Sequence, residues 1–474
     1  MAVGVINSLM VNFLVYSRRV LGVFESAIEE AKRSGSERIA VATLPIMGAF
    51  PELEVIRQAS VLAPVFYVND PIKNVELLSV GAEMMREFHG EDAIASASTA
   101  FKEYLKVQSG DELVSPLFYG GFAFAPGYER TGVWQKWPDG LWVWPRWQWV
   151  KEGGRVSLIV SHRVHADSNA EDMFRDLQAD LQKMAVDQLL PDSLSERSLR
   201  VAENESTNAE AWKQAVKETV GDIKNKKYEK VVLARKIALH ADQHLDTISA
   251  LTKLKASNSI NVSFYLDYAG EVFVGSTPER LVETRNNQVA IDCLAGTAPR
   301  GQTDDEDDAI GNRLLANSKD LNEHQLVRTG ILESVKGVAK VSAPKTPMLR
   351  KLTYVQHLYT PIRGELAAGK TLFDLVEKLH PTPAVSGLPN ELAKQVILER
   401  EGMDRGFYAG PIGWMDRDGN GTFVVALRSG LLCGNQAVLF AGAGIVSDSD
   451  SEAEWQETEW KLTTMRTAIG IESN

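Results

Sequence analysis

The feature that most constrains the fold is a series of four short apolar runs between residues 262 and 294. The runs are Val262–Tyr268, Val272–Gly275, Leu281–Thr284 and Gln288–Leu294, and only a few residues separate each from the next. Connections this short join antiparallel strands, because parallel strands need a crossover of a dozen residues or more. No Gly-x-Gly-x-x-Gly or phosphate-loop sequence supports a doubly wound alternative.

The remaining patterns place helices between groups of strands. Helical spacing of apolar residues predicts helices over Val20–Arg33, Ala170–Leu189, 304–335, Thr371–Leu379 and Leu388–Glu401. Apolar and β-branched runs predict further strands at Ile39–Leu44, Phe118–Phe124, Arg155–Val164, Lys230–Arg235, Gly410–Asp416, Gly421–Leu432 and Ala437–Gly442. This grouping predicts an α+β fold, with large antiparallel sheets and helices packed outside.

The length of 474 residues exceeds that of an ordinary single domain. Pro191–Ser206 is polar enough for a surface linker. We therefore expect an N-terminal α+β region over residues 1–200, which contributes strands to a common sheet core, and a second region over residues 205–474.

Charge and composition exclude several classes of partner. The net charge of −12 leaves no basic stripe to neutralise phosphates, so we expect no nucleic-acid partner. Six of the ten tryptophans lie between Trp134 and Trp149. This stretch is either a platform for a nucleic base or packed sheet, and the lack of basic residues around it favours packed sheet.

Cysteine usage and the N-terminus indicate the compartment. Cys293 and Cys433 are too few for a disulfide framework and indicate a reducing environment. The N-terminal apolar run is interrupted by Asn7 and Asn12, and its arginines follow the run instead of preceding it, which is the wrong order for a secretory signal. We expect a cytoplasmic protein without a membrane span.

The stretch Ala441–Lys461 carries the first candidate chemistry. Gly442 and Gly444 give it a small and flexible beginning, where backbone N–H groups can approach a ligand. Its second half reads as an acidic helix, with Glu454 and Glu457 on one face and Lys461 one turn later. Such a face can hold a cation and an anionic ligand together; the alternative is a solvated acidic helix.

A second acidic pair strengthens the metal interpretation. Asp320 and Glu323 have the same i, i+3 spacing on another predicted helix. Mg²⁺ prefers oxygen ligands and often takes one or two carboxylates, with water and substrate in the other positions. Two helices that each offer one carboxylate, supported by a second, fit this preference.

Three charged residues in strand-like contexts are candidates for catalysis or binding. Lys230 opens a β-branched strand and is either a buried base or an exposed strand-end lysine. Glu279 follows Pro278 at a strand end and is either a general acid or part of a surface Glu–Arg turn. Arg428 lies in a strongly apolar run and must find an anion, either an internal carboxylate or a bound one.

Several ordered motifs identify a family resemblance. They are Lys-Val-Val-Leu-Ala-Arg from Lys230, Ser-Thr-Pro-Glu-Arg from Ser276, Leu-Ala-Gly-Thr from Leu294, Asn-Ser-Lys-Asp-x-x-Glu-His from Asn317, His-Pro-Thr-Pro-Ala-Val-x-Gly from His380, Ala-Leu-Arg from Ala426 and Ala-Gly-Ala-Gly-Ile-Val from Ala441. Together they resemble the chorismate-utilising enzymes, and most closely the isochorismate synthases. The resemblance covers residues 205–470, and the first 200 residues match only loosely.

The resemblance implies a mechanism and its residues. It implies that Mg²⁺ joins the substrate's ring carboxylate to Glu323 and Glu457. In the same way, Lys230 would activate a water that attacks C2 of chorismate, and Glu279 would protonate the departing C4 hydroxyl. The resemblance also implies supporting residues: Asp320 and Glu454 for the metal through its waters, Arg428, Tyr408, Lys461 and the Gly442–Gly444 backbone for the substrate carboxylates, Gly296 and Thr297 for the ring, and His380 without a defined role.

This sequence differs from the typical motifs of the family at two positions, and other activities within the family are alternatives. Thr277 stands where many relatives have serine, and Asp320 where many have glutamate, which shortens a supporting arm for the metal. Lys230 and Ala295 differ from the residues typical of anthranilate and aminodeoxychorismate synthases, so we expect no glutamine amidotransferase subunit, and we expect a monomer. Salicylate synthase is the alternative activity, and a catalytically silent binding protein is another. The length resembles the menaquinone-branch enzymes more than the siderophore-branch enzymes.

Overall fold

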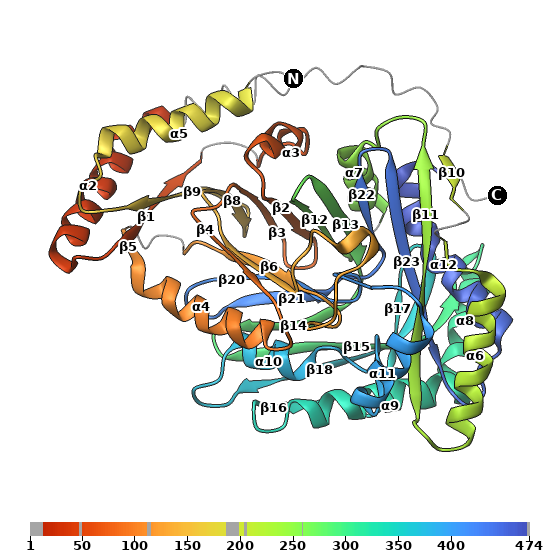
Figure 1. Ribbon diagram of the computed structural model, residues 1–474. Coiled ribbons are helices and arrows are strands. Elements are labelled where there is room, and N and C mark those ends of the chain that lie inside the picture. Colours follow the sequence, from red (N-terminus) through yellow and green to blue (C-terminus); the bar gives the residue numbers. More distant parts are fainter. Residues whose placement is uncertain are drawn as a thin grey trace.

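The structure is a computed structural model that describes residues 13–46, 50–110, 115–185, 199–202, 206–257 and 259–471. Within these residues two large sheets lie one above the other, and helices cover their outer sides (Figure 1). The helices are α2 (Ser17–Ser34), α3 (Glu54–Ala59), α4 (Ala93–Val107), α5 (Ala170–Ala185), α6 (Ala209–Lys224), α7 (Thr247–Ser257), α8 (Asp304–Ala316), α9 (Ser318–Ser334), α10 (Leu372–Leu379), α11 (Asn390–Arg400) and α12 (Ser451–Ile469), with short 3₁₀ turns η1 (Ser60–Leu62) and η2 (Gly132–Trp134).

The first sheet is antiparallel except for the β1–β5 pair. Its spatial order is β10 (Leu199–Val201), β11 (Lys230–Ala241), β23 (Gln436–Ile445), β22 (Ser429–Cys433), β13 (Glu271–Thr277), β12 (Val262–Tyr268), β2 (Val65–Asp70), β3 (Val75–Val80), β8 (Trp147–Glu152), β9 (Arg155–Val164), β1 (Arg38–Pro45) and β5 (Gln108–Gly110), with β19 (Gly387–Leu388) beside β11. The sheet therefore joins strands from the two halves of the chain at the β12–β2 pair.

The second sheet is antiparallel throughout its described pairs. Its spatial order is β16 (Ala339–Ser342), β18 (Val355–Leu366), β15 (Gln288–Pro299), β14 (Arg280–Arg285), β21 (Gly421–Val425), β20 (Pro411–Met415), β6 (Phe118–Phe122), β7 (Gly140–Trp144) and β4 (Met84–Phe88), with β17 (Met348–Lys351) beside β18. Here too the halves of the chain meet, at the β20–β6 pair. The prediction of an α+β fold with large antiparallel sheets and helices outside is confirmed.

The core between the sheets is rich in aromatic rings. Phe66 of β2 stacks on Tyr119 of β6, with the ring centroids 4.7 Å apart. The six tryptophans between residues 134 and 149 are all buried. Trp147 and Trp149 belong to a second core, which includes buried residues of α2 and α5. Packed sheet, rather than a platform for a nucleic base, is therefore confirmed for this stretch.

Two predictions about strands were wrong. The run Gly421–Leu432 is not one strand, because β21 ends at Val425 and β22 begins at Ser429. β21 pairs with β14 in the second sheet and β22 with β13 in the first, so the chain changes sheets between them. Gly442 and Gly444 are not in a flexible segment either; both lie within β23 and pair with β11.

Other predictions fall at the limits of the described residues. The expected linker Pro191–Ser206 contains a short strand, β10, while residues 191–198 and 203–205 lie outside the described residues. The N-terminal apolar run also lies mostly outside them. In the part of the chain that the structure describes, every helix is too short or too polar to cross a membrane.

Candidate active site

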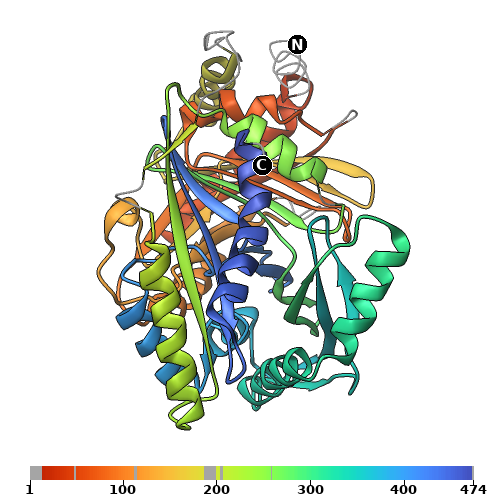
Figure 2. The same cartoon turned by 90° about the vertical axis from the view of Figure 1, so that its right-hand side faces the viewer.

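A cavity lies among the β11–β23 pair, β15, α9, α12 and the corner between β13 and β14. α12 runs along β23 in Figure 2, and α9 packs against β15. Most of the predicted site residues line this cavity: Glu279, Gly296, Thr297, Glu323, Tyr408, Arg428, Gly442, Gly444, Glu457 and Lys461. The structure thus brings together residues that are up to about 180 positions apart in the sequence.

Side-chain caps fix where the two acidic helices begin. Asn317 accepts hydrogen bonds from the backbone N–H groups of Lys319 and Asp320 at the start of α9, at 2.9 and 3.2 Å. Asp450 does the same for the first residues of α12, Glu452 and Ala453, at 3.1 and 3.0 Å. A cap satisfies N–H groups that lack partners within the helix, and it sets which side chains of the first turns face the cavity.

The carboxylates on these helices are crowded and paired with lysines. The ion pairs, measured from lysine Nζ to carboxylate oxygen, are Lys230–Glu323 at 3.0 Å, Lys461–Glu457 at 2.6 Å and Lys319–Glu454 at 2.8 Å. Burial, then the neighbouring Glu323, raises the pKa of Asp320 to about 6. Burial, then Glu457, raises the pKa of Glu454 to about 7. Neighbouring carboxylates therefore repel each other here, and a divalent cation would relieve this repulsion.

The donor set fits a hard divalent cation. Glu323 and Glu457 face one cavity from two helices, and both offer carboxylate oxygens. A Cβ at Gly444 would collide with Glu323, so a glycine at this position keeps the space beside that carboxylate free. Among the described residues, no three His, Cys, Asp or Glu side chains are gathered closely enough to form a metal cluster. A cation held here would complete its ligands with water or substrate, as Mg²⁺ usually does.

Lys230 is fully buried at the beginning of β11. The alternative of an exposed strand-end lysine is therefore wrong. Its Nζ lies behind Glu323, and its Cε would be 3.1 Å from a Cβ at Gly444. Lys230 does not itself line the cavity, and its contact with the cavity wall is the ion pair with Glu323. Burial alone would raise the pKa of Glu323. The Lys230 ammonium overcomes this effect, so the pKa of Glu323 is lowered.

Glu279 lies at the point where the chain crosses from β13 in the first sheet to β14 in the second. It is 5% exposed, and the next residue, Arg280, instead pairs with Asp70, so the alternative of a surface turn is wrong. Burial, opposed by Lys230, raises the pKa of Glu279 to about 7. Its carboxyl forms no ion pair with a described residue, and it therefore holds a proton near neutral pH inside the cavity.

Arg428 lies at the neighbouring crossing, between β21 and β22, with a left-handed backbone angle φ of 49°. It is buried, and in the described residues no carboxylate comes within ion-pair distance of its guanidinium. Of the two alternatives, an internal or a bound anion, this arrangement favours the bound anion. Tyr408 lines the same wall, and burial raises its pKa to about 12, so its hydroxyl remains a donor.

The opposite wall is formed by a bulge in β15. Gly296 has a φ of 81° at an irregularity in the β15–β18 register, a conformation that glycine adopts readily. Thr297 pairs across the strands with His357, whose Nδ1 is 3.1 Å from the threonine Oγ1. Burial and the charges of Arg428 and Lys461 hold the pKa of His357 well below its usual value. The ring is therefore neutral, and its Nε2 faces Arg428 at 3.4 Å.

Four predicted site residues do not line the cavity: Lys230, Asp320, Glu454 and His380. Lys230 and Glu454 pair with residues of α9, whereas His380 lies apart. It ends α10, and its Nε2 lies 3.2 and 3.1 Å from the carbonyl oxygens of Ala123 and Phe124. The loop that follows still reaches the cavity through Ala384 and Val385. The histidine therefore holds this loop against the N-terminal part of the chain.

Sequence reasoning missed two polar residues of the cavity wall. His357 gave no signal because its role depends on being opposite Thr297, and that register is visible only in the folded sheet. Arg405 donates to the carbonyl oxygens of Val232 and Val385 at 2.9 and 2.8 Å, and it pairs with Glu401. It lies between the recognised motifs, so only its burial reveals that it joins two walls of the cavity.

Comparison with known proteins identifies the family. A sequence profile described as chorismate binding enzyme matches residues 26–470. The chain belongs to the chorismate-binding enzymes. It is 36% identical over 419 residues to isochorismate synthase MenF of Bacillus subtilis, covering 86% of this chain and 88% of that protein. It is 31% identical over 465 residues to the salicylate biosynthesis isochorismate synthase of Pseudomonas aeruginosa, covering 94% of each.

Solved structures of related proteins share this fold. The menaquinone-specific isochorismate synthase MenF of Escherichia coli matches with a TM-score of 0.74 and 26% identity, covering 94% of this chain and 99% of that one. Anthranilate synthase component I of Streptococcus pneumoniae matches with a TM-score of 0.67 and 21% identity, covering 83% of this chain and 92% of that one. The second likeness extends to the fold alone. The resemblance drawn from the motifs is therefore confirmed for the family.

Proposed function

We propose that this chain is an isochorismate synthase, which interconverts chorismate and isochorismate. The observation that carries the proposal is that Glu279, Glu323 and Glu457 line one cavity, while Lys230 lies directly behind its wall in an ion pair with Glu323. The names of the relatives from Bacillus subtilis and Escherichia coli support the same activity. A base, an acid and a cation site are the parts that this exchange of hydroxyl groups requires.

The proposed reaction assigns one proton transfer to each side of the cavity. Lys230, in its neutral amine form, takes a proton from the water that attacks C2 of the ring, and the ring double bonds shift. Glu279 gives its proton to the C4 hydroxyl, which leaves as water. The pKa of about 7 suits Glu279 for this role, because a good catalytic acid titrates near the working pH. Since one allylic hydroxyl replaces another, the reaction is nearly balanced and reversible.

We propose Mg²⁺ as the cation. Glu323 and Glu457 would be its direct ligands, while Asp320 and Glu454 would act through its waters. Bound there, the cation would neutralise the substrate carboxylate next to the reacting carbon. The three lysines that pair with these carboxylates would then compete with the cation for the carboxylate oxygens. This competition would release Lys230 from Glu323.

The substrate carboxylates have their own proposed partners. Arg428 and Tyr408 offer a charge and a hydroxyl on one wall, and Lys461 offers a charge from α12. Lys461 is held in place by the Gly442 carbonyl oxygen, 2.8 Å from its Nζ. The β23 backbone at Gly442 and Gly444, and Gly296 with Thr297 on the facing strand, would line the ring. We assign His380 to the support of its loop instead of to the substrate.

The two regions of the chain have different proposed tasks. We propose that residues 205–474 carry the catalysis and that residues 1–200 complete the sheets. We also propose a monomer that works without a glutamine amidotransferase subunit. The two cysteines are free thiols, which supports a reducing, cytoplasmic location. The menaquinone branch is the proposed pathway.

Product analysis tests the activity. Purified protein with chorismate and Mg²⁺ should form isochorismate, followed by chromatography, and should return chorismate when isochorismate is supplied. A lactate-dehydrogenase-coupled assay should detect no pyruvate. Pyruvate released in step with chorismate consumption, without an added lyase, would identify a salicylate synthase instead. Binding of chorismate without any product would identify a silent binding protein.

A further inference from the structure

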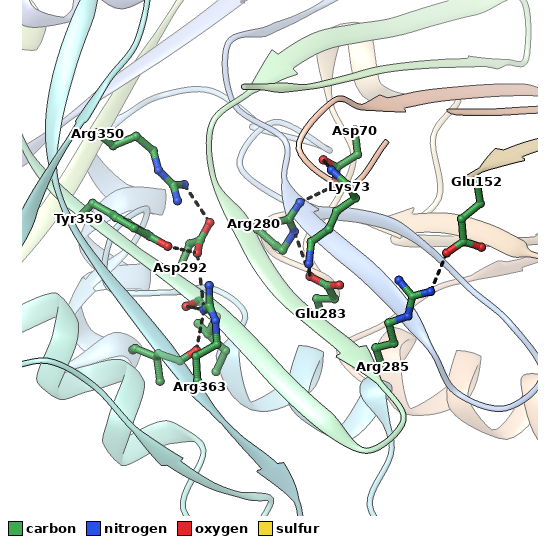
Figure 3. A network of polar contacts seen from close by, with 12 residues as sticks. Asp70, Lys73, Glu152, Arg280, Glu283, Arg285, Asp292, Arg350, Tyr359 and Arg363 are labelled. Carbon is green, nitrogen blue, oxygen red and sulfur yellow. Dashed lines mark hydrogen bonds and ion pairs between the residues drawn. The ribbon is translucent and has the colours of Figure 1, made fainter. Parts of the chain in front are cut away.

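Asp292, Arg350 and Tyr359 form a polar cluster (Figure 3). Through Pro278, the cluster contacts the corner that carries Glu279. Arg350 of β17 donates from Nη1 to Asp292 Oδ2 at 2.9 Å and to the Pro278 carbonyl oxygen at 3.2 Å. Its guanidinium lies over the Tyr359 ring, 3.7 Å from the centroid, and the Tyr359 hydroxyl donates to Asp292 Oδ1 at 3.0 Å. Arg350 thus joins a closed cluster from three strands to the residue that precedes Glu279.

The cluster is built to keep one geometry. Asp292 is 5% exposed, and each of its two carboxylate oxygens has a separate donor. The Arg350 side chain is 16% exposed and is held by a charge partner and a ring at the same time. Charge-assisted hydrogen bonds and stacking on an aromatic ring both restrict the guanidinium, so the second N–H of Nη1 is presented to Pro278 in a fixed direction.

The rest of the corner is fixed through its backbone. The Thr277 hydroxyl donates to the Val425 carbonyl oxygen at 2.6 Å and accepts from the Glu279 N–H at 3.2 Å. The Val425 N–H donates to the Glu279 carbonyl oxygen at 3.0 Å. On the other side of the corner, Arg280 is held by Asp70, as Figure 3 shows. Among the residues that the structure describes, the Glu279 carboxyl has no ion-pair partner, so contacts to the backbone of this corner contribute to its direction.

We infer that Arg350 is a positioning residue for the reaction: held by Asp292 and Tyr359, it fixes the Pro278 carbonyl and thereby aims the Glu279 carboxyl at the leaving hydroxyl. The inference rests on the proposed function of Glu279. Without Arg350 the Pro278 carbonyl loses its side-chain donor, and the corner can rotate between Thr277 and Glu279. A displacement of about 1 Å at a reacting group can lower the rate of a reaction by about 100-fold.

The charges around Glu279 shift its pKa in both directions. Asp292 raises the pKa of Glu279 in addition to burial, whereas Lys230, Arg428 and Lys461 lower it. Three of these four charges favour the ionised carboxylate, so the raised pKa of Glu279 comes chiefly from burial of the carboxyl in the cavity wall.

A pair of arginine variants tests the inference. Arg350→Met removes the donor to Pro278, and we expect kcat to fall by about 10-fold to 100-fold. The KM for chorismate and the Mg²⁺ dependence should stay near wild type, because the substrate and metal partners are untouched. Arg350→Lys should recover part of kcat. If Arg350 only stabilised the fold, its replacement would not lower kcat while leaving KM unchanged, and Arg350→Lys would not recover part of kcat.

Arg363→Met is the matched control. Arg363 reaches Asp292 Oδ1 at 4.0 Å and donates to the carbonyl oxygens of Ile291 and Ile362, but it does not contact Pro278. We expect this variant to keep the wild-type kcat. If Arg350→Met proves unstable, Tyr359→Phe loosens Asp292 but keeps the ring, and it should give a smaller fall in kcat with the same unchanged KM.

Failure of the positioning role and failure of the proposed activity give different results. If wild-type protein forms isochorismate and the Arg350 or Tyr359 variants match Arg363→Met in kcat, the positioning role is overturned. If wild-type protein forms no isochorismate, the proposed function fails first. Calorimetric binding of chorismate to wild type and to Arg350→Met keeps these outcomes separate, because the inference expects equal affinity for the two proteins.

Discussion

The carboxylates of α9 and α12 and the carboxyl of Glu279 line one cavity, but they are held in different ways. On the helix side, Glu323, Glu454 and Glu457 each pair with a lysine side chain. On the strand side, Glu279 has no charged partner in the described residues, and hydrogen bonds to the neighbouring strands hold its backbone. The helix side therefore holds charged groups of both signs in pairs, and the strand side holds one carboxyl without an ion-pair partner.

The difference matches the two tasks that the proposed reaction sets. A lysine ammonium is a point charge on a flexible stem, so it can give up a carboxylate when a divalent cation arrives. A carboxyl that must stay protonated is better kept away from lysines and fixed through its backbone, since a nearby ammonium would drive off the proton. The helix side therefore suits exchange of cations, and the strand side suits a single proton transfer.

Removal of Lys230 should have the largest effect, because Lys230 pairs with Glu323 of the helix side and is also the proposed base of the reaction. In Lys230→Ala we expect kcat to fall by up to about 10⁴-fold, the upper range for a lost acid–base group. Calorimetry should still detect binding of chorismate and of Mg²⁺.

Lys319→Met provides the control for that experiment. It removes another lysine of the same set of ion pairs without touching the proposed base, and it should keep most of its kcat at saturating Mg²⁺. Near-wild-type turnover by Lys230→Ala would remove the lysine from the mechanism.

The Glu279→Gln variant tests whether the carboxyl on the strand side supplies the proton. We expect kcat to fall by about 100-fold or more, because glutamine cannot supply the proton. In the wild type the carboxyl is protonated below its pKa of about 7, so kcat/KM should decline as the pH rises above this value. This decline should be absent from the variant.

A carboxylate outside the cavity controls for the effect of charge removal. Glu283 of β14 is buried near the same corner and pairs with Lys73 at 2.9 Å. The Glu283→Gln variant should keep the decline above pH 7. A loss of less than tenfold in Glu279→Gln at every pH would mean that the proton comes from another group.

The smallest expected effects concern the helix side. Glu323→Gln and Glu457→Gln should each weaken Mg²⁺ affinity by at least about 10-fold to 100-fold, the loss that follows even when a residue supporting a metal ligand is changed. The double variant should lose much less than the sum of the two free energies, because residues that share one ion act as a unit. Calorimetric titration with Mg²⁺ measures all four proteins. Fully additive losses would argue that the two carboxylates do not share a cation.

The helix side could be predicted from local spacing. Asp320 with Glu323, and Glu454 with Glu457, are three residues apart, and on a helix such pairs share a face whatever the rest of the fold does. The motifs around Lys230 and Glu279 identified the other two groups. Each of these predictions needed only a segment of a few residues, and the structure places the segments around one cavity.

The strand side depended on pairings that no local pattern contains. Arg428 looks like part of one strand because its neighbours are apolar, yet β21 and β22 belong to different sheets. Arg350 reaches Pro278 only because β17 pairs with β18 and β18 with β15. The same limit applies to His357, and it explains why His380, although part of a recognised motif, could not be placed relative to the cavity.

The pairing of β2 with β12 and of β6 with β20 has a consequence for the synthesis of the chain. A ribosome releases the N-terminal strands first, so β2 and β6 each wait with one open edge for a partner from the second half. The edge of β6 stays open until Pro411–Met415 has emerged. Open edges are templates for association between chains. Nascent or truncated chains that end before β20 are therefore the form of this protein most exposed to aggregation and most dependent on chaperones.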